Sequence, residues 1–265
     1  MEQIASTYRP ISLEEMRSVK LLNRTDTKFV ASLQQVMQLL RIASNHYRMQ
    51  ETDGLRLQPY HTIYFDTAGL KMYNDHQHGQ FPRQKVRIRS YLHSGLSFLE
   101  VKTKDNHRRT SKKRKTIDFV NYPTMPMGYV TVPNCIEAHE AFIAEYLKIS
   151  MQGLVPQLEN QFNRITLVNN DCTERLTIDT GLRFRNYVTG RTHSLDQIAI
   201  IELKRDGLRP SPILELLRQL RIKPHGFSKY CMGTAYTNPQ APVNLFKERL
   251  HYVDRIIANN NNITR

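Results

Sequence analysis

The chain has 265 residues, of which 40% are hydrophobic and 23% are charged, values ordinary for a soluble globular protein with a substantial core. Lysine and arginine number 38 against 24 aspartates and glutamates, which gives a formal net charge of +14. Solubility does not require an excess this large. The charge therefore points to an anionic partner: nucleic acid, anionic lipid or a phosphate-rich substrate.

The cysteines and the start of the chain bear on the compartment. Cys135, Cys172 and Cys231 lack the spacing of metal ligands, and their odd number argues against a disulfide framework. Residues 1–10 lack the apolar core of a signal peptide, and no stretch approaches the roughly 20 apolar residues that span a bilayer. We therefore expect a cytoplasmic protein without a transmembrane segment, which leaves a membrane-protein partner open.

Capping residues and apolar spacing place the elements of the first half of the chain. Ser12 can cap a short helix, and a strand is expected over 23–30. Ser32 then begins an amphipathic helix, and Asp66 can cap a further helical turn. Further strands are expected over 61–66, 84–93, 96–104 and 112–120.

The second half predicts a helix over 136–148, strands over 159–168, 175–180, 183–189 and 197–204, and helices over 212–220, 228–236 and 245–258. Neither a repeat nor a long linker interrupts this pattern. We therefore expect one domain over residues 1–265, with its core over about 20–240 and helical extensions at both ends. The expected fold class is α+β, with a mostly antiparallel sheet, curled or closed, and helices packed around it.

Charged residues alternate with apolar ones along several of these strands. Side chains on a strand point alternately to opposite faces, so Lys85, Arg87 and Arg89 share one face while Val86 and Ile88 share the other. The same alternation groups further charged residues on one face of their strands: Arg24, Asp26 and Lys28; Glu100, Lys102 and Lys104; Glu202 and Lys204; and, in similar contexts, Arg164 and Arg175.

A solvated sheet face is the simplest interpretation of any one of these strands. Two features favour an inward orientation instead. The charges repeat over many strands with a bias to arginine and lysine, and the amphipathic helices need the apolar strand faces to cover. A closed barrel with helices outside would turn the charged faces inward. Such a lining needs an anion, because Asp26, Glu100 and Glu202 offset only part of its charge, and phosphate chains suit arginine and lysine best.

The charged strands carry a family resemblance. The chain resembles the VTC (vacuolar transporter chaperone) domain, the polyphosphate polymerase branch of the CYTH-like triphosphate tunnel metalloenzymes. The resemblance spans about residues 23–230 and rests on these segments in order: Arg24-Thr-Asp-Thr-Lys28-Phe29, Tyr64-Phe65-Asp66-Thr67, Lys85-Val-Arg87-Ile-Arg89-Ser-Tyr91, Phe98-Leu-Glu100-Val-Lys102, Asn163-Arg164, Ile178-Asp179, Ile201-Glu202-Leu-Lys204 and Phe227-Ser228-Lys229-Tyr230.

The resemblance implies an eight-stranded antiparallel β-barrel that forms a tunnel for ATP and inorganic polyphosphate. It implies that the catalytic residues that bind the phosphate groups are Lys28, Arg87, Arg89, Lys102, Arg164 and Lys229. The resemblance also implies a divalent metal, Mn²⁺ or Mg²⁺, with Glu202 as its main ligand and Glu100 as a secondary candidate. Further substrate-binding cations are expected at Arg24, Lys85, Lys104, Lys112, Arg175 and Lys204.

One departure from the wider superfamily separates its branches. Hydrolases and cyclases of that superfamily usually open with a Glu-x-Glu-x-Lys pattern, whereas this strand reads Arg24-x-Asp26-x-Lys28. An arginine in place of a carboxylate removes a metal ligand and adds a phosphate ligand. The change favours a polymerase that transfers the γ-phosphate of ATP to a growing chain.

Two other functions stay open at this point. The first is an inorganic triphosphatase or nucleoside triphosphatase on the same barrel. The second is a non-catalytic binder of polyphosphate or RNA. The basic run over 108–115 is compatible with nucleic acid, but no aromatic platform for bases accompanies it, so we expect no nucleic-acid partner. The sequence does not indicate an oligomeric state.

Overall fold

The computed structural model describes residues 1–17, 24–107, 109–120, 139–148, 153–207 and 210–263. Its main feature is a path of eight hydrogen-bonded antiparallel strands. In spatial order these are β2 (Arg24–Ser32), β11 (Ile198–Asp206), β9 (Glu174–Asn186), β8 (Leu154–Asn169), β4 (Gln58–Thr67), β5 (Arg83–Tyr91), β6 (Leu96–Lys104) and β7 (Thr110–Ile117). The α+β class and the antiparallel path of eight strands confirm the sequence prediction.

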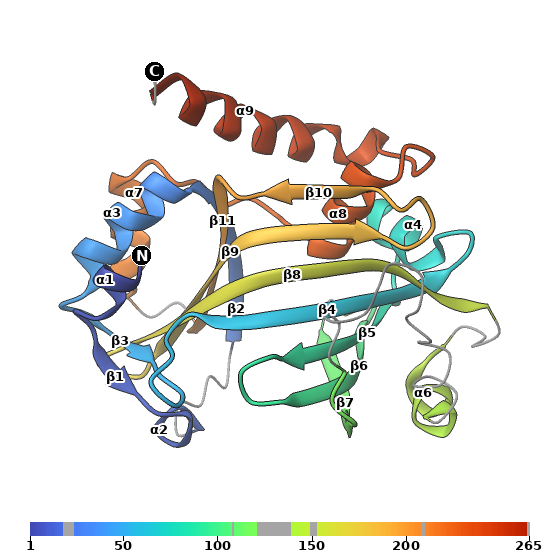
Figure 1. Cartoon of the computed structure of the whole chain (residues 1–265), viewed down its shortest axis with the longest axis horizontal. Helices are drawn as coiled ribbons and strands as arrows, with labels where there is room; N and C mark the ends of the chain where they lie inside the picture. Colours follow the sequence, from blue (N-terminus) through green and yellow to red (C-terminus); the bar gives the residue numbers. More distant parts are fainter. Residues whose placement is uncertain (18–23, 108, 121–138, 149–152, 208–209, 264–265) are drawn as a thin grey trace.

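The sheet is strongly curled (Figure 1). Backbone pairing within the described ranges does not join the two ends of the path, β2 and β7. Lys28 of β2 nevertheless lies close enough to Lys102 of β6 to lower the pKa of that lysine. Strands from opposite ends of the path can approach in this way only if the sheet bends around the face that carries both lysines. We call this side, which also carries Arg87, Arg164 and Glu202, the concave face.

Three short strands were not predicted. β1 (Arg9–Ile11) runs parallel to β3 (Tyr47–Gln50), which in turn extends the sheet beside β8, and β10 (Thr192–Leu195) pairs with β9. The strands predicted over 175–180 and 183–189 are one continuous strand, β9. Gly181, with φ +60, lies in its middle opposite a register shift in β8, so the strand bends there without ending.

The convex face is apolar and is covered by helices. On the β2, β11 and β9 side it meets α3 (Leu33–Ala43), α7 (Pro212–Gln219) and the short α1 (Glu2–Ala5). On the β4, β5 and β6 side it meets α4 (Lys71–Gln77) and α6 (Glu140–Tyr146). Residues 136–138 of the predicted helix over 136–148 lie outside the described ranges.

The helix starts follow the predicted caps. Ser12 caps α2 (Leu13–Arg17) through the backbone N–H of Glu15, and Ser32 forms a capping box with Gln35 at the start of α3. Asp66 accepts hydrogen bonds from the backbone N–H groups of Met72 and Tyr73 in α4. Each of these contacts satisfies backbone donors that a helix leaves unpaired at its N-terminus.

Two C-terminal elements close one end of the concave face. These are α8 (Lys229–Thr237) and α9 (Lys247–Ile263), which follows the 3₁₀ turn η1 (Asn244–Phe246). In Figure 1, α9 lies along one side of the molecule next to β10, with α8 between it and the sheet. The apolar side of α8 packs with Leu158, Phe162 and Phe184. The lining is therefore apolar at this end, and the charged residues lie beyond it.

Gly233 allows α8 to approach the sheet this closely. A Cβ at this position would lie 2.5 Å from Phe184 Cδ1 and 2.6 Å from Leu158 Cδ2. We expect Gly233→Ala to lower the free energy of unfolding by about 1–2 kcal/mol, because overpacking outweighs the better helix propensity of alanine. Denaturant titration measures this change. Gly69→Ala is the matched control, since a Cβ there meets nothing within 4 Å, and equal stabilities for both variants would contradict the prediction.

Candidate functional site

The strand register brings the predicted cations together on the concave face. Lys28 lies opposite Glu202, Lys85 opposite Lys102, and Arg87 opposite Glu100. α8 adds Lys229 from the closed end. The charged residues gathered on this face include the cations Lys28, Lys85, Arg87, Arg89, Lys102, Arg164, Lys204 and Lys229, and the carboxylates Glu100, Asp179 and Glu202. Cations clearly outnumber carboxylates.

Asp179 holds two of the cations. The Nε and Nη2 atoms of Arg164 donate to its two carboxylate oxygens at 2.6 and 2.7 Å, and Lys229 Nζ donates to Oδ2. Lys229 also lies over the ring of Phe162, with Nζ 4.4 Å from the centroid. Burial alone would raise the pKa of Asp179, but Arg164 and Lys229 outweigh burial and hold the pKa well below its usual range.

Glu100 holds a second pair of cations. Arg87 Nη2 lies 2.6 Å from Oε2, and Lys112 Nζ donates to Oε1 at 3.1 Å. The Glu100 side chain is only 1% exposed. Burial opposes its ionisation, but Arg87, Arg89 and Lys112 lower its pKa to about 2. Both carboxylate oxygens are therefore engaged by cations.

Glu202 is the more accessible carboxylate, with 23% of its side chain exposed. Lys204 Nζ donates to Oε2, and Lys28 Nζ lies 4.0 Å from Oε1. Burial raises the pKa of Glu202, but the neighbouring lysines outweigh burial and hold the pKa far below its usual range. One carboxylate oxygen thus has only a distant partner.

Arg89, Lys85 and Lys102 have no carboxylate partner within the described part of the chain. Arg89 is buried, its Nε donates to Thr62 Oγ1 at 3.3 Å, and its guanidinium lies over the rings of Tyr60 and Phe162. Lys85 Nζ donates to Ser228 Oγ at 2.9 Å. The Lys102 side chain stays open to solvent, although it lies deep among other cations. These three residues give the face most of its uncompensated charge.

Crowding lowers the pKa values of the lysines on this face. Partial desolvation within the curled sheet and the neighbouring Lys28, Arg87 and Lys85 lower the pKa of Lys102 to about 7. Burial also lowers the pKa of Lys85 to about 8, and that of Lys229 to about 8 despite the favourable charge of Asp179. An unfolded lysine titrates near 10.5, so the charged form of each lysine is disfavoured in the fold. A bound polyanion would reverse that penalty.

We expect the affinity for tripolyphosphate to fall as pH rises from about 7 to about 9.5, because these lysines then lose their protons. Over the same pH range, binding should be accompanied by proton uptake, because the bound polyanion raises the pKa values of these lysines. Without ligand the sign for stability is opposite: the depressed pKa values reduce stability at neutral pH, and this loss is recovered as pH rises toward 10.5.

Isothermal titration in buffers of different ionisation enthalpy measures the proton uptake. Lys102→Arg is the control, since arginine keeps its charge over this range and should flatten the pH profile. Affinity that rises with pH in both proteins would contradict this assignment of the lysines.

The other predicted cations lie nearer the edges of the site. Lys112 reaches Glu100, and Lys104 lies over the ring of Phe81 with its Nζ 5.7 Å from the centroid. Arg175 is opposite Lys204 in register. Arg24 begins β2, but its side chain lies outside the described part of the structure.

Several residues of the site were not predicted as functional. Tyr60 and Phe162 flank the guanidinium groups of Arg89 and Arg164. Tyr64 lies among the cations; burial would raise its pKa, but Arg87, Arg89 and Lys229 outweigh burial and lower the pKa. The alternation Tyr60, Thr62, Tyr64 along β4 is the signal that could have placed them on the charged face.

The carboxylates differ in how well they suit a divalent metal. Among the described residues, no three His, Cys, Asp or Glu side chains gather into a metal cage. Mg²⁺ in phosphoryl-transfer sites usually takes one or two carboxylates and completes its shell with phosphate oxygens and water. Glu202 fits that role, since it is partly exposed and one of its oxygens has only a distant partner, Lys28 at 4.0 Å. Glu100 fits less well, because both of its oxygens are engaged and it is almost fully buried.

The residues that form this site lie within a segment that matches a known protein family. The family model of the VTC domain matches residues 23–238, which include every strand of the main path. The chain belongs to the VTC domain family. No curated protein sequence matches this VTC domain.

Solved structures give weaker similarities to the VTC domain. PH1012 from Pyrococcus horikoshii OT3 has 11% identity and a TM-score of 0.41, covering 78% of this chain and 98% of that one. A conserved hypothetical protein from Pyrococcus furiosus has 15% identity and a TM-score of 0.41, with coverages of 77% and 97%. HpAC1 from Hippeastrum, described as having a dominant triphosphatase activity, has 15% identity and a TM-score of 0.45, with coverages of 83% and 98%.

Within the described residues of the VTC domain, no helix combines the length and the apolar character needed to cross a bilayer.

Proposed function

We propose that this VTC domain is a metal-dependent polyphosphate polymerase, which transfers the γ-phosphate of ATP to a growing inorganic polyphosphate chain. The observation that carries the proposal is the excess of cations on the concave face, with Arg89, Lys85 and Lys102 lacking carboxylate partners in the described structure. A linear polyanion supplies the missing negative charge, and family membership agrees with that substrate class.

Phosphoryl transfer depends on alignment and on neutralising charge, so it needs little covalent help from protein. In our proposal Arg87, Arg89, Lys102 and Arg164 align the triphosphate end to end with the acceptor chain. Lys28 and Lys229 orient the chain from β2 and α8. The cofactor, Mn²⁺ or Mg²⁺, would be held by Glu202 and would withdraw charge from phosphate oxygens when bound.

The proposed step requires no side-chain base. A terminal phosphate oxygen of the chain is already ionised near neutral pH and attacks the γ-phosphorus of ATP. A new P–O bond forms, the bond from the γ-phosphorus to the β,γ-bridging oxygen breaks, and ADP leaves with that electron pair. A water molecule in place of the chain end would give ADP and orthophosphate, which is the triphosphatase reaction.

Product analysis tests this proposal. Purified protein incubated with ATP and Mn²⁺ or Mg²⁺ is expected to give ADP and polyphosphate that forms a ladder on a gel. ADP and orthophosphate alone would replace polymerase by triphosphatase, and tight polyphosphate binding without any turnover would indicate a binder. The proposed partners are accordingly ATP and polyphosphate.

Glu202→Gln should reduce polymer formation by roughly 100-fold or more, because the contribution of a metal to charge stabilisation is several kcal/mol. Removing the charge also frees Lys28 and Lys204, so tripolyphosphate binding without metal should be kept or strengthened. Initial rates and a binding titration measure both effects. Glu140→Gln on the exposed surface of α6 is the control. Equal losses in rate and in metal-free binding would contradict a metal role for Glu202.

A further inference from the structure

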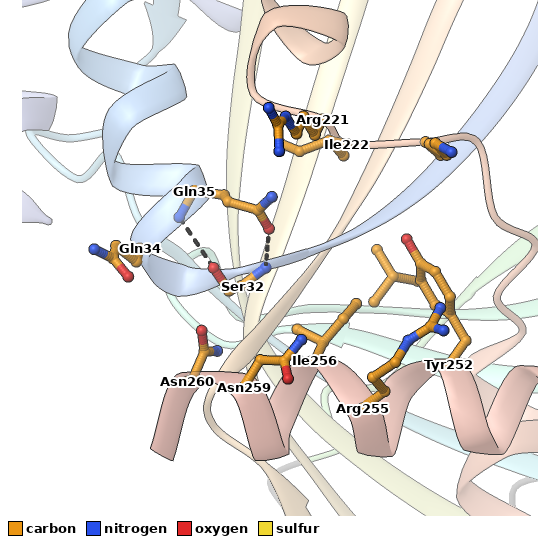
Figure 2. A pocket seen from close by; sticks show the side chains of 12 residues that line it. Ser32, Gln34, Gln35, Arg221, Ile222, Tyr252, Arg255, Ile256, Asn259 and Asn260 are labelled. Carbon is orange, nitrogen blue, oxygen red and sulfur yellow. Dashed lines mark hydrogen bonds between the residues drawn. The ribbon is translucent and has the colours of Figure 1, made fainter. Parts of the chain in front are cut away.

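A cavity of about 420 Å³ lies away from the charged residues of the concave face, between the start of α3, the segment 221–223 and α9. Figure 2 shows Gln35, Arg221, Tyr252 and Arg255 around this space, although they come from three separate parts of the chain. Its volume is within the usual range for pockets that hold small ligands. We call it the α3–α9 pocket. Its lining is Val30, Ser32, Gln34, Gln35, Arg221, Ile222, Lys223, Tyr252, Arg255, Ile256, Asn259 and Asn260.

The charged residues of the α3–α9 pocket all have the same sign. Arg221, Lys223 and Arg255 line it, and the lining contains no carboxylate. Within the described ranges, the side chains of Arg221 and Lys223 make neither a hydrogen bond nor an ion pair. Arg255 lies over the ring of Tyr252, 5.5 Å from its centroid. Three cations around one space, without an acid among them, favour an anion at that space.

The wall of the pocket combines these cations with apolar surface. Val30 and Ile222 are buried beneath it, and Ile256 adds apolar surface from α9. Arg221 has a φ of +56, a backbone conformation that residues other than glycine rarely adopt. It is maintained by the backbone hydrogen bonds from Arg221 N to Arg218 O and from Ile222 N to Leu217 O. These two bonds form the Schellman motif that ends α7, so the helix end fixes the position of Arg221 at the pocket.

We propose that the α3–α9 pocket is a second binding site, separate from the charged residues of the concave face, for a small phosphorylated ligand about the size of a mononucleotide. Its phosphate contacts Arg221, Lys223 and Arg255, since arginine binds phosphate oxygens through paired donors. Its body lies against Ile222 and Ile256. Gln34, at the first turn of α3, offers an amide to its polar groups.

The segment that lines the pocket continues directly into the concave face. Pro224 bridges to Phe29 of β2, and His225 N donates to Lys28 O at 2.8 Å. Lys28 Nζ in turn donates to Phe227 O at 3.0 Å, two residues before Lys229. A ligand that restrains 221–223 therefore also restrains the backbone around two cations of the concave face. Tripolyphosphate would then bind to a backbone that is already ordered and would lose less conformational entropy on binding. AMP in the pocket should therefore raise the affinity for tripolyphosphate, and the coupling is reciprocal.

A tryptophan reporter tests the site without relying on turnover. The chain contains no tryptophan, so Asn259→Trp on an exposed turn of α9 places a single fluorophore in the pocket lining. The probe is AMP. We expect a saturable change in fluorescence that persists when Arg89→Ala is added, because Arg89 belongs to the concave face.

Charge variants in the Asn259→Trp background decide the outcome. Lys223→Gln/Arg255→Gln should raise the half-saturating AMP concentration by roughly tenfold or more, the usual effect of losing charge-assisted contacts. Arg41→Gln/Lys247→Gln removes the same charge from exposed positions and should leave it unchanged. The proposed site is overturned if the fluorescence change does not saturate at millimolar AMP, or if both double variants shift the half-saturating AMP concentration equally. It is also overturned if adenosine gives the same fluorescence change as AMP. An unchanged affinity for tripolyphosphate at saturating AMP overturns the coupling.

Discussion

We expect Asp179→Asn to lower the free energy of unfolding by about 3–5 kcal/mol, the range for removing one partner from a buried ion pair. The substitution keeps the size of the side chain but leaves Arg164 and Lys229 without their carboxylate, although these side chains are only 16% and 11% exposed. The depressed pKa of Asp179 gives the wild-type fold a contribution that is present above the unfolded value of 3.8 and lost as pH falls below it. The variant should lack that part of the acid dependence.

Denaturant and thermal unfolding measure this loss. Asp196→Asn is the matched control, because its pair with Arg183 is 3.9 Å long and both side chains are more than half exposed. An exposed pair contributes about 0–1 kcal/mol. Tripolyphosphate should raise the melting temperature of Asp179→Asn more than that of the wild type, since the polyanion takes the place of the lost charge. A purely structural role for Asp179 would give equal shifts in both proteins.

The second large effect concerns Arg89. We expect Arg89→Ala to reduce kcat/KM for polyphosphate formation by roughly 100-fold or more, because the residue is buried on the charged face and its guanidinium forms no ion pair with a carboxylate in the described structure. Arg89→Lys should recover only part of the activity, since lysine keeps the charge but loses the paired donors of the guanidinium. Steady-state kinetics and tripolyphosphate binding measure both variants.

Arg185→Ala provides the matched control for Arg89. Arg185 also lies over an aromatic ring, 5.4 Å from the centroid of Tyr187, but its place in the β9 register puts it opposite Glu159, on the face away from the cations. Its loss should leave kcat/KM nearly unchanged. Arg89→Ala has an intact carboxylate network around it, so a fall in stability as large as that of Asp179→Asn would show that Arg89 supports the fold and not the ligand.

The sequence predicted the charged face well because a strand has a period of two. Once the strand containing Arg87 was recognised, Lys85 and Arg89 had to share its face, and the paired register confirms that they do. The caps at Ser32 and Asp66 were equally local and were predicted for the same reason. Each of these features depends on residues that are close along the chain.

What the sequence could not provide depends on contacts between distant residues. The sequence alone leaves Asp179 open between a structural and a lining role, and only the fold brings Lys229, 50 residues away, onto its carboxylate. Similarly, β3 exists as a strand because β8 extends past the end of β4 and pairs with β3 there. The packing of α8 into the end of the sheet depends on Gly233 meeting Phe184 and Leu158, a match that no local pattern encodes.

The three carboxylates among the cations have a consequence for a substrate that must advance. A polymer that binds to bare fixed charges would have to leave each of them at a high energetic cost, and its movement would be slow. On this face Asp179 can re-form its ion pairs with Arg164 and Lys229, and Glu100 can re-form its ion pair with Arg87, as soon as a phosphate moves away. In the proposed polymerase, built-in counterions of this kind would flatten the energy profile along the path, so that the chain could slide forward one unit at a time without dissociating between additions.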